Sequence, residues 1–241
     1  MFVGYLNTRL LNKIMDEHLA EFVGSMIGDG CLSVINSEKR KRKIALLTGH
    51  LFHDSNYYET VIRPIVQKEF GTDGYLQKRK KRNCIYFVMS GIVFDFLHNV
   101  GFPVGRKYNL FIHDEIFKYR DLSIACVRGI FDTDGSIYRR YSKRYASHTK
   151  VYDYLVIQFK MDSKKTIEQI KEILARLQIE TNKIISERNS YVLRITKQEY
   201  VTKFMEMIKP SNKYHVERYI NRCKKAQSNG PLAQLVEHSK I

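Results

Sequence analysis

The chain has 241 residues, 44% of them hydrophobic, and its 41 Lys and Arg against 25 Asp and Glu give a formal net charge of +16. This composition excludes a largely disordered chain, and no apolar run in the sequence approaches the roughly 20 residues that a membrane-spanning helix needs. The excess of positive charge favours a polyanionic partner such as nucleic acid.

The first group of predicted elements runs from residue 11 to residue 99. Apolar side chains at helical spacing predict a helix over residues 11–28, and the glycines on either side of Asp29 end it. The pattern that follows predicts two strands, a helix, two more strands and a short helix, over 31–37, 43–52, 56–70, 74–80, 84–90 and 92–99.

The same order of elements begins again after a connector. A helix is predicted over 121–132, ended by Asp134 and Gly135, and further elements follow over 136–142, 152–161, 164–177, 183–188, 190–196 and 199–208. Asp29 and Asp134 lie 105 residues apart, which is too long for a solenoid repeat and indicates two pseudo-symmetric halves of one fold. We expect a first half over 10–100, a connector over 101–120, a second half over 121–226 and a disordered tail over 227–241.

Two short segments at matching positions carry a family resemblance. Residues 22–30 read FVGSMIGDG and residues 127–135 read VRGIFDTDG. They resemble the paired motifs of the single-chain LAGLIDADG homing endonucleases, and residues 101–137 are similar to archaeal intron and intein members. The resemblance implies an α+β fold of two pseudo-twofold-related αββαββα halves, each with a curved antiparallel DNA-binding sheet, packed through the two motif helices.

The physical chemistry of the motifs agrees with a cation site. Gly24 and Gly28 are four residues apart, as are Gly129 and Thr133, so each helix has a stripe of small residues that allows close packing. If the helices pack, Asp29 and Asp134 emerge together at their negative C-terminal ends, where two carboxylates favour a divalent cation. A single Gly-Asp-Gly is commonly only a helix cap and turn, but two at matching positions favour a site.

The resemblance also implies the roles of individual residues. It implies hydrolysis of a phosphodiester bond in each strand with Mg2+ or Mn2+, giving a double-strand break across the minor groove. Ile27 stands where the consensus has its first Asp, but the metal-binding acid is the later one. The implied metal ligands are Asp29 and Asp134 with the carbonyls of Gly28 and Thr133. The implied catalytic residues are the same two acids, a polar strand residue in each half and a lysine in each half: His50, Gln158, Lys107 and Lys213.

Basic residues gather at the predicted hairpins of both halves. Antiparallel ribbons can lie in the major groove and read base edges while flanking cations hold the phosphates. Because the halves differ in sequence, we expect a long, imperfectly palindromic DNA target. The candidate DNA-binding residues are Lys39, Arg40, Lys41, Arg42, Lys43, Lys78, Lys80, Arg82, Arg139, Arg140, Lys143, Arg144, Lys160, Arg188 and Arg194.

Other function classes stay open on the sequence. A maturase that assists the splicing of its own intron would share this fold, which makes intron RNA an alternative partner. A non-cleaving regulator of the same fold is expected to lack the two acids, yet both are present. His50 and His53 would suit a different metal nuclease, but no matching constellation accompanies them.

The setting of the protein follows from smaller signals. Residues 1–18 carry charges where a signal peptide needs an apolar core, so we expect location in the cytoplasm or inside an organelle, without membrane association. Met1 and the final residues lack the groups of protein splicing, which predicts a freestanding, intron-encoded protein. Both acids in one chain predict a monomer. Four widely spaced cysteines fit neither a zinc site nor a disulfide scaffold: Cys31, Cys84, Cys126 and Cys223.

Overall fold

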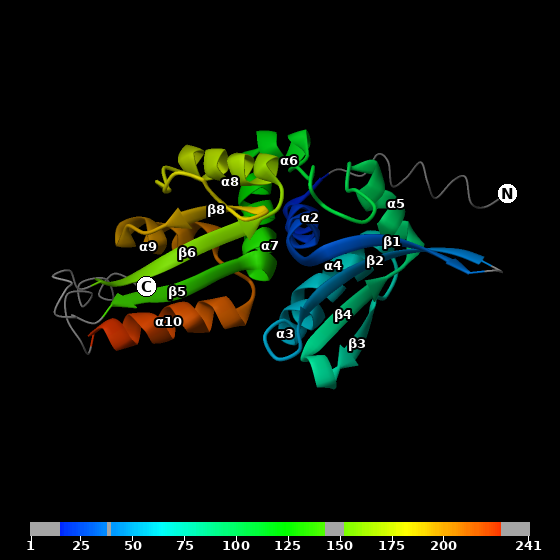
Figure 1. Ribbon diagram of the computed structural model, residues 1–241. Coiled ribbons are helices and arrows are strands. Elements are labelled where there is room, and N and C mark those ends of the chain that lie inside the picture. The colour runs from blue at the N-terminus through cyan, green and yellow to red at the C-terminus, as the bar shows by residue number, and fades with distance from the viewer. Residues whose placement is uncertain (1–14, 38–39, 143–151, 228–241) are drawn as a thin grey trace.

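Two helices of matching sequence, α2 (Glu17–Asp29) and α7 (Arg120–Asp134), pack against each other at the centre of the molecule (Figure 1). The computed structural model describes residues 15–37, 40–142 and 152–227. Helix α2 starts where the side chain of Asp16 accepts a hydrogen bond from the backbone N–H of Leu19, at 2.8 Å. This N-cap satisfies a donor that the first turn would otherwise leave unpaired.

The two central helices approach so closely that glycine is required where they cross. A β-carbon added to Gly24 would collide with the carbonyl oxygen of Cys126, and one added to Gly129 would collide with that of Glu21. The stripe of small residues predicted from the sequence therefore lies in the helix interface, and it brings the C-terminal ends of both helices together.

Each half carries a four-stranded antiparallel sheet beside its central helix. The strand orders are β1-β2-β4-β3 and β5-β6-β8-β7, which confirms the α+β fold of two equivalent halves. The first sheet comprises β1 (Gly30–Ser37), β2 (Arg40–His50), β3 (Tyr75–Arg79) and β4 (Cys84–Met89), and the second comprises β5 (Gly135–Ser142), β6 (Tyr152–Met161), β7 (Ile185–Glu187) and β8 (Ser190–Ile195).

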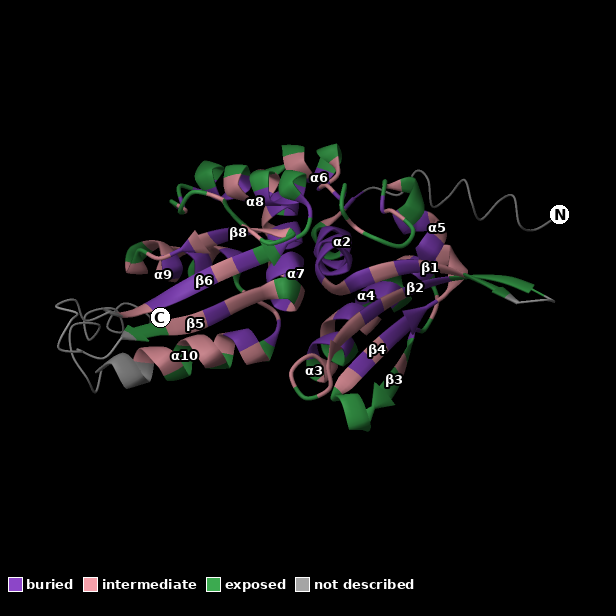
Figure 2. Ribbon diagram, in the orientation of Figure 1, coloured by how far each residue is buried: buried purple, intermediate pink, exposed green. Residues whose placement is uncertain are grey.

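Further helices cover one face of each sheet (Figure 1). Apolar residues of the central helices and of the covered sheet faces are buried, as Figure 2 shows, and Phe131 packs edge-on against Phe159 and Phe204. The helix predicted over 56–70 has a wide π-turn (Tyr58–Ile62) just before Pro64, whose missing N–H and bulky ring disturb the regular hydrogen bonds. The covering helices are α3 (Ser55–Tyr57), α4 (Arg63–Phe70), α5 (Gly91–Asn99), α8 (Lys164–Arg176) and α9 (Gln198–Ile208).

The sequence patterns do not predict two of the observed helices. Helix α6 (Asp114–Lys118) lies in the connector, and α10 (Lys213–Gln227) lies along the edge strand β5. Polar residues dilute the apolar spacing of α10, although His215 within it is buried against Phe131, with ring centroids 4.8 Å apart. Among the helices of the described residues, none is long and apolar enough to cross a membrane.

Candidate active site

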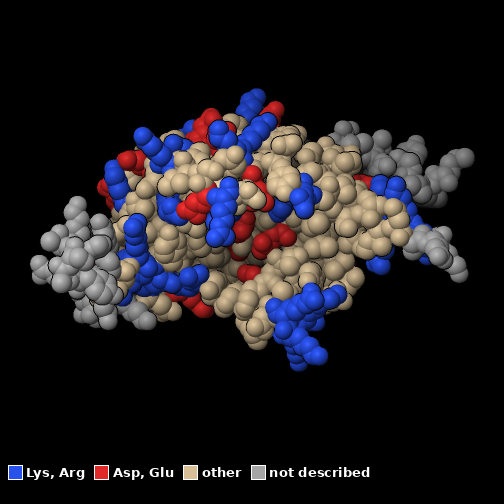
Figure 3. Space-filling model, viewed as in Figure 1, with Lys and Arg blue, Asp and Glu red and all other residues tan. Residues whose placement is uncertain are grey.

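Asp29 and Asp134 lie at the C-terminal ends of α2 and α7, and Asp134 lines a hollow between the two halves together with Ile27, Gly30 and Lys107. Each acid is followed by a glycine whose backbone N–H closes the last helical turn, Gly30 onto Met26 and Gly135 onto Phe131, before the chain leaves as a strand. Figure 3 shows acidic groups gathered in this hollow and basic groups on the outer parts of both halves. The two carboxylates therefore lie at the ends of the central helices, between the basic outer parts of the two halves.

The surroundings of Asp29 and Asp134 raise the pKa values of both carboxyl groups. Burial in the hollow, followed by the charges of Asp134 and Asp54, raises the pKa of Asp29 to about 7, and Lys107 opposes this rise. Asp134 is more exposed to solvent than Asp29, and desolvation of its carboxylate by the surrounding protein raises its pKa to about 6, against the lowering effect of Lys107 and with a further increase from Asp162. Carboxylates that repel each other in this way gain from a bound cation.

The donor set fits a hard divalent cation such as Mg2+ or Mn2+. Carboxylate oxygens from Asp29 and Asp134 and backbone carbonyls at the same helix ends are oxygen ligands of the kind these ions prefer. Within the described part of the chain, no group of three or more His, Cys, Asp or Glu side chains could hold a metal ion unaided. A cation here would therefore depend on the two acids together with carbonyls, water and the phosphates of a bound nucleic acid.

The raised pKa of Asp29 predicts a pH-dependent loss of stability. The folded protein holds a proton that the unfolded chain releases, so this stabilising contribution is complete below the unfolded-state pKa of about 4 and is lost as the pH rises to about 7. Asp29→Asn removes the charge, and its melting temperature should exceed that of the wild type increasingly from pH 4 to pH 7, by roughly 2–4 °C per kcal/mol recovered. Thermal melts across this range test it, and a constant difference would contradict it.

Lys107 reaches the site from the loop that follows α5. The loop is held against β1, where Gly105 donates its N–H to the carbonyl of Leu32 at 3.0 Å. The Lys107 ammonium donates to the carbonyl oxygen of Ile27 at 3.0 Å and also to that of Gly28. Burial lowers its pKa, and Asp134 and Asp29 oppose the change. The structure thus brings the lysine predicted for the first half to the two acids.

Lys213 does not take the corresponding place in the second half. It is exposed at the start of α10, and the neighbouring Asn212 lies at the end of α7 instead. The Asn212 amide donates to the carbonyl oxygen of Asp132 and to Oδ1 of Asp54, each at 3.0 Å. The turn after Pro210 is one residue shorter than the turn after Pro103, and Lys213 begins α10 directly after it.

His50 and Gln158 are not equivalent in the sheets either. Gly30 pairs with Leu47 and Gly135 pairs with Phe159, so the counterpart of Gln158 is Leu46, and His50 lies four residues farther along its strand. The difference arises where the chain leaves each strand: eight residues lead from Leu46 to Asp54, including a turn over residues 51–54, whereas four lead from Gln158 to Asp162.

The surroundings of these two residues differ as well. Gln158 Oε1 accepts hydrogen bonds from Arg194 at 2.7 Å and from the hydroxyl of Tyr138 at 3.3 Å. The ring of His50 stacks on that of His53, with centroids 4.1 Å apart, and His53 stacks on Tyr214 of α10 at 3.9 Å. Gln158 thus belongs to a polar group on the second sheet, whereas His50 belongs to a ring stack that joins the two halves.

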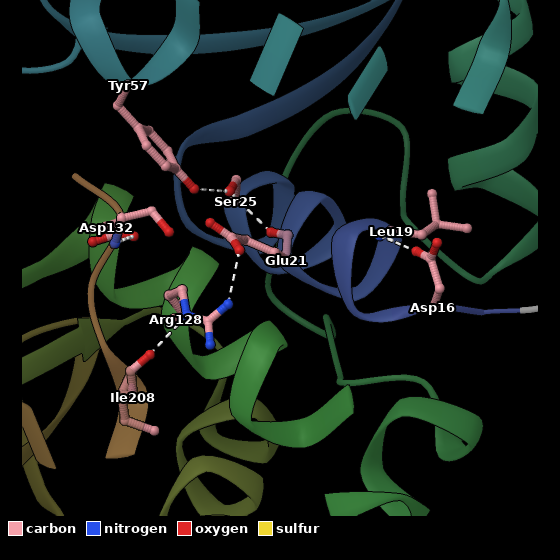
Figure 4. A network of polar contacts seen from close by, with 9 residues as sticks. Asp16, Leu19, Glu21, Ser25, Tyr57, Arg128, Asp132 and Ile208 are labelled. Carbon is pink, nitrogen blue, oxygen red and sulfur yellow. Dashed lines mark hydrogen bonds and ion pairs between the residues drawn. The ribbon is translucent and has the colours of Figure 1, made fainter. Parts of the chain in front are cut away.

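A buried polar network supports the helix interface behind the acids (Figure 4). Arg128 on α7 forms an ion pair with Glu21 on α2 at 3.0 Å and donates to the carbonyl of Ile208 at 2.7 Å. Asp132, which stands where the first motif has Ile27, accepts the N–H of Ser211 at 2.7 Å. Burial raises the pKa of Asp132 well above its usual range. These contacts give Asp132 a structural role in holding the turn into α10.

The described candidate DNA-binding residues lie on the strands and turns of both sheets. Several are held by acids: Arg139 by Asp153 at 2.5 Å, and Lys160 and Arg194 by Glu187 at 3.4 and 2.7 Å. The exposed candidate residues at the β3–β4 turn are Lys78, Lys80 and Arg82, which lie there beside the further exposed cations Arg79 and Lys81, and Arg188 is exposed at the β7–β8 turn. The strand β2 carries Arg40, Lys41, Arg42 and Lys43, and β5 carries Arg139 and Arg140. Lys39, Lys143 and Arg144 lie outside the described residues.

Comparisons with known proteins agree with this architecture. Residues 121–209 match a model described as a LAGLIDADG-like domain, and residues 50–107 match the WhiA LAGLIDADG-like domain. A search of curated proteins found no match. Among solved structures, the chain is similar to I-DmoI in complex with DNA and Mn, with 18% identity, a TM-score of 0.56 and coverage of 80% of this chain and 96% of that one.

Two further solved structures extend the likeness over more of the chain. I-AabMI bound to uncleaved DNA is 12% identical, with a TM-score of 0.57 and coverage of 93% of this chain and 99% of that one. I-SmaMI bound to uncleaved DNA in the presence of calcium ions is 12% identical, with a TM-score of 0.61 and coverage of 93% and 94%. Family models match in both halves, the fold is that of these solved structures, and each half has a motif helix at its centre. The chain therefore belongs to the LAGLIDADG family and contains two copies of the motif.

Proposed function

We propose that the protein is a homing endonuclease that cuts both strands of a long, imperfectly palindromic DNA site with Mg2+ or Mn2+. The observation that carries the proposal is the pair of acids, Asp29 and Asp134, in a hollow flanked by two basic sheets. Solved structures of the same fold are described as complexes with DNA, and some with Mn or calcium ions, which supports this choice of partner and cofactor. None of these three is described as an RNA complex, so the proposal is confined to DNA.

The residues of the site suit phosphodiester hydrolysis. A divalent cation, when bound, supplies a Lewis acid that neutralises phosphate charge and activates water. Asp29 and Asp134 would hold one or two such cations with the carbonyls of Gly28 and Thr133. Lys107 supplies a positive charge beside the acids, and Gln158 offers a polar group on the neighbouring sheet. With one acid from each half, a single chain presents one carboxylate to each DNA strand.

The test is cleavage of the intron-free junction of the host gene. The purified protein with Mg2+ should linearise a plasmid that carries this junction and leave a plasmid with the intron inserted intact. Sizing of the complex should give one chain per duplex, which follows from both acids lying in one chain. Failure to cut any junction sequence, or a complex with two chains per site, would contradict the proposal in its present form. We also propose that the protein is encoded by an intron and acts in the cytoplasm or inside an organelle.

The basic sheets predict a steep salt dependence of DNA binding. Lys78, Lys80 and Arg82 are exposed, so replacing all three with Ala should weaken binding and, if each contacts a phosphate, reduce the slope of log K against log salt by about 3. The matched control replaces three cations on the covering helices α8 and α9: Lys164, Lys171 and Lys203. Fluorescence anisotropy over a range of salt concentrations measures both slopes. Equal effects of the two triple variants would show that the β3–β4 turn is not a DNA contact.

A non-cleaving DNA-binding protein of the same fold is the second candidate. The match of residues 50–107 to the WhiA LAGLIDADG-like model leaves this candidate open. The presence of both acids at the helix ends favours the endonuclease instead. Binding without cleavage under every divalent cation tested would select this second candidate.

A further inference from the structure

The two ends of the central helix pair carry different side chains. Lys107 donates to the last-turn carbonyls of α2, those of Ile27 and Gly28. At the end of α7 the donor is the Asn212 amide, which bonds the carbonyl of Asp132. The pseudo-twofold relation between the halves therefore breaks at this point, because one donor is charged and the other is neutral.

The position of the Lys107 ammonium resembles that of a bound cation. It lies on the Gly28 carbonyl, and the charges that act on it most strongly are those of Asp134 and Asp29. Gly28 is packed against the other helix, where an added β-carbon would lie 3.3 Å from Cβ of Asp134. A carbonyl oxygen next to carboxylates is the setting that a divalent cation requires, and two cations cannot share it without strong repulsion.

At the end of α7, the described contacts of Asn212 include no cationic side chain. Its amide also donates to a carboxylate oxygen of Asp54 at 3.0 Å. Asp54 in turn acts on Asp29 as a like charge. By the pseudo-twofold relation, a cation position beside the Gly28 carbonyl and Asp134 has a counterpart beside the Thr133 carbonyl and Asp29. The first position already contains the Lys107 ammonium, whereas the donor at the end of α7 is the neutral Asn212 amide.

We propose that Lys107 is a built-in cation that excludes a divalent ion from the position beside Gly28 and Asp134 until DNA is bound, so that the two cation positions fill unequally. The inference rests on the proposed function, because it assumes a cation-dependent site. A phosphate group of bound DNA offers the ammonium a new partner and would draw it away from the carbonyls. The Asp29 side is then occupied first, and the Asp134 side only in the complex.

The experiment measures Mn2+ binding to the DNA-free protein by electron paramagnetic resonance and calorimetry. The wild type should bind one ion tightly and a second weakly, and Lys107→Met should tighten the weaker one by about tenfold. Lys107→Gln keeps a hydrogen-bond donor without the charge and should show the same gain, which guards against misfolding of the Met variant. The matched control is Lys213→Met, which loses the same charge from an exposed position and should bind as the wild type does.

The possible results separate this inference from the proposed function. Two equal sites in the wild type, or the same affinities in the variants of Lys107 and Lys213, would overturn the inference while leaving a cation-dependent nuclease in place. No saturable Mn2+ binding that depends on Asp29 would contradict the metal dependence of the proposed function, and the inference with it. Two unequal sites that become alike only in the Lys107 variants would support the role assigned to this lysine.

Discussion

Asp134→Asn is expected to abolish double-strand cleavage while leaving DNA binding nearly intact. Asn has the size of Asp and keeps one oxygen acceptor, but it lacks the charge that holds a divalent cation between the helix ends. The loss of this stabilisation should slow cleavage by roughly a thousandfold or more. Binding should stay the same or tighten, because the variant removes a negative charge that faces phosphate. Plasmid linearisation and fluorescence anisotropy on the same preparation measure the two effects.

The folding control for this variant also has a predicted sign. A carboxylate at a helix C-terminus interacts unfavourably with the helix dipole, so Asp134→Asn should melt at the wild-type temperature or above it. Asp29→Asn should lose cleavage in the same way, because the acids are contributed one from each helix. Unfolding of Asp134→Asn would make the acid a structural cap, and cleavage of both strands at near the wild-type rate would refute the two-carboxylate mechanism.

Gly129→Ala is expected to have the largest effect on stability. Its β-carbon would collide with the carbonyl oxygen of Glu21 and the backbone nitrogen of Ser25 on the facing helix. Backbone atoms in a helix cannot move aside as a side chain can, so α2 and α7 would have to separate. We expect a loss of roughly 3 kcal/mol or more in the free energy of unfolding, measured by urea denaturation. Cleavage should fall as well, because separation of the helices moves the two acids apart.

The control for this prediction is another glycine in a helix. Gly91 opens α5, and the nearest atoms to an added β-carbon are those of Lys43 at 3.8 Å, which is ordinary van der Waals contact. Gly91→Ala should therefore be neutral or slightly stabilising, since Ala restricts the unfolded chain. If Gly129→Ala unfolds at the same urea concentration as Gly91→Ala, the two central helices do not cross as closely as the structure shows.

Local patterns are enough to predict the central elements of the fold. The helix containing Gly24 and the helix containing Gly129 follow from apolar spacing, and the position of the acids follows from the glycines that end each helix. Helix α10 is harder to predict, because the polar residues between Tyr214, Tyr219 and Cys223 leave only a weak apolar pattern.

Residues that depend on contacts between distant segments are harder still. Aligning Lys107 with Lys213 matches the two lysines across turns that differ by one residue, and only the folded chain shows that Asn212 reaches the end of α7. Pairing His50 with Gln158 assumes the same spacing between each strand and the Asp-Ser that follows it, whereas strand register is set by hydrogen bonding across the whole sheet. A buried asparagine in a loop has no periodic signal, so sequence reasoning could not have found Asn212 without the tertiary contacts.

Helix α10 has a consequence for the behaviour of the protein at high concentration. Strand β5 is an edge strand, and an uncovered edge offers unpaired backbone groups to the sheet of another molecule. Helix α10 lies along this edge, and the bridge between Leu32 and Val104 occupies part of the corresponding edge at β1. The outer edge strands β3 and β7 are short, with five and three residues. All four edges are thus shielded or brief, which disfavours sheet-to-sheet aggregation and keeps the DNA-facing surfaces available to DNA.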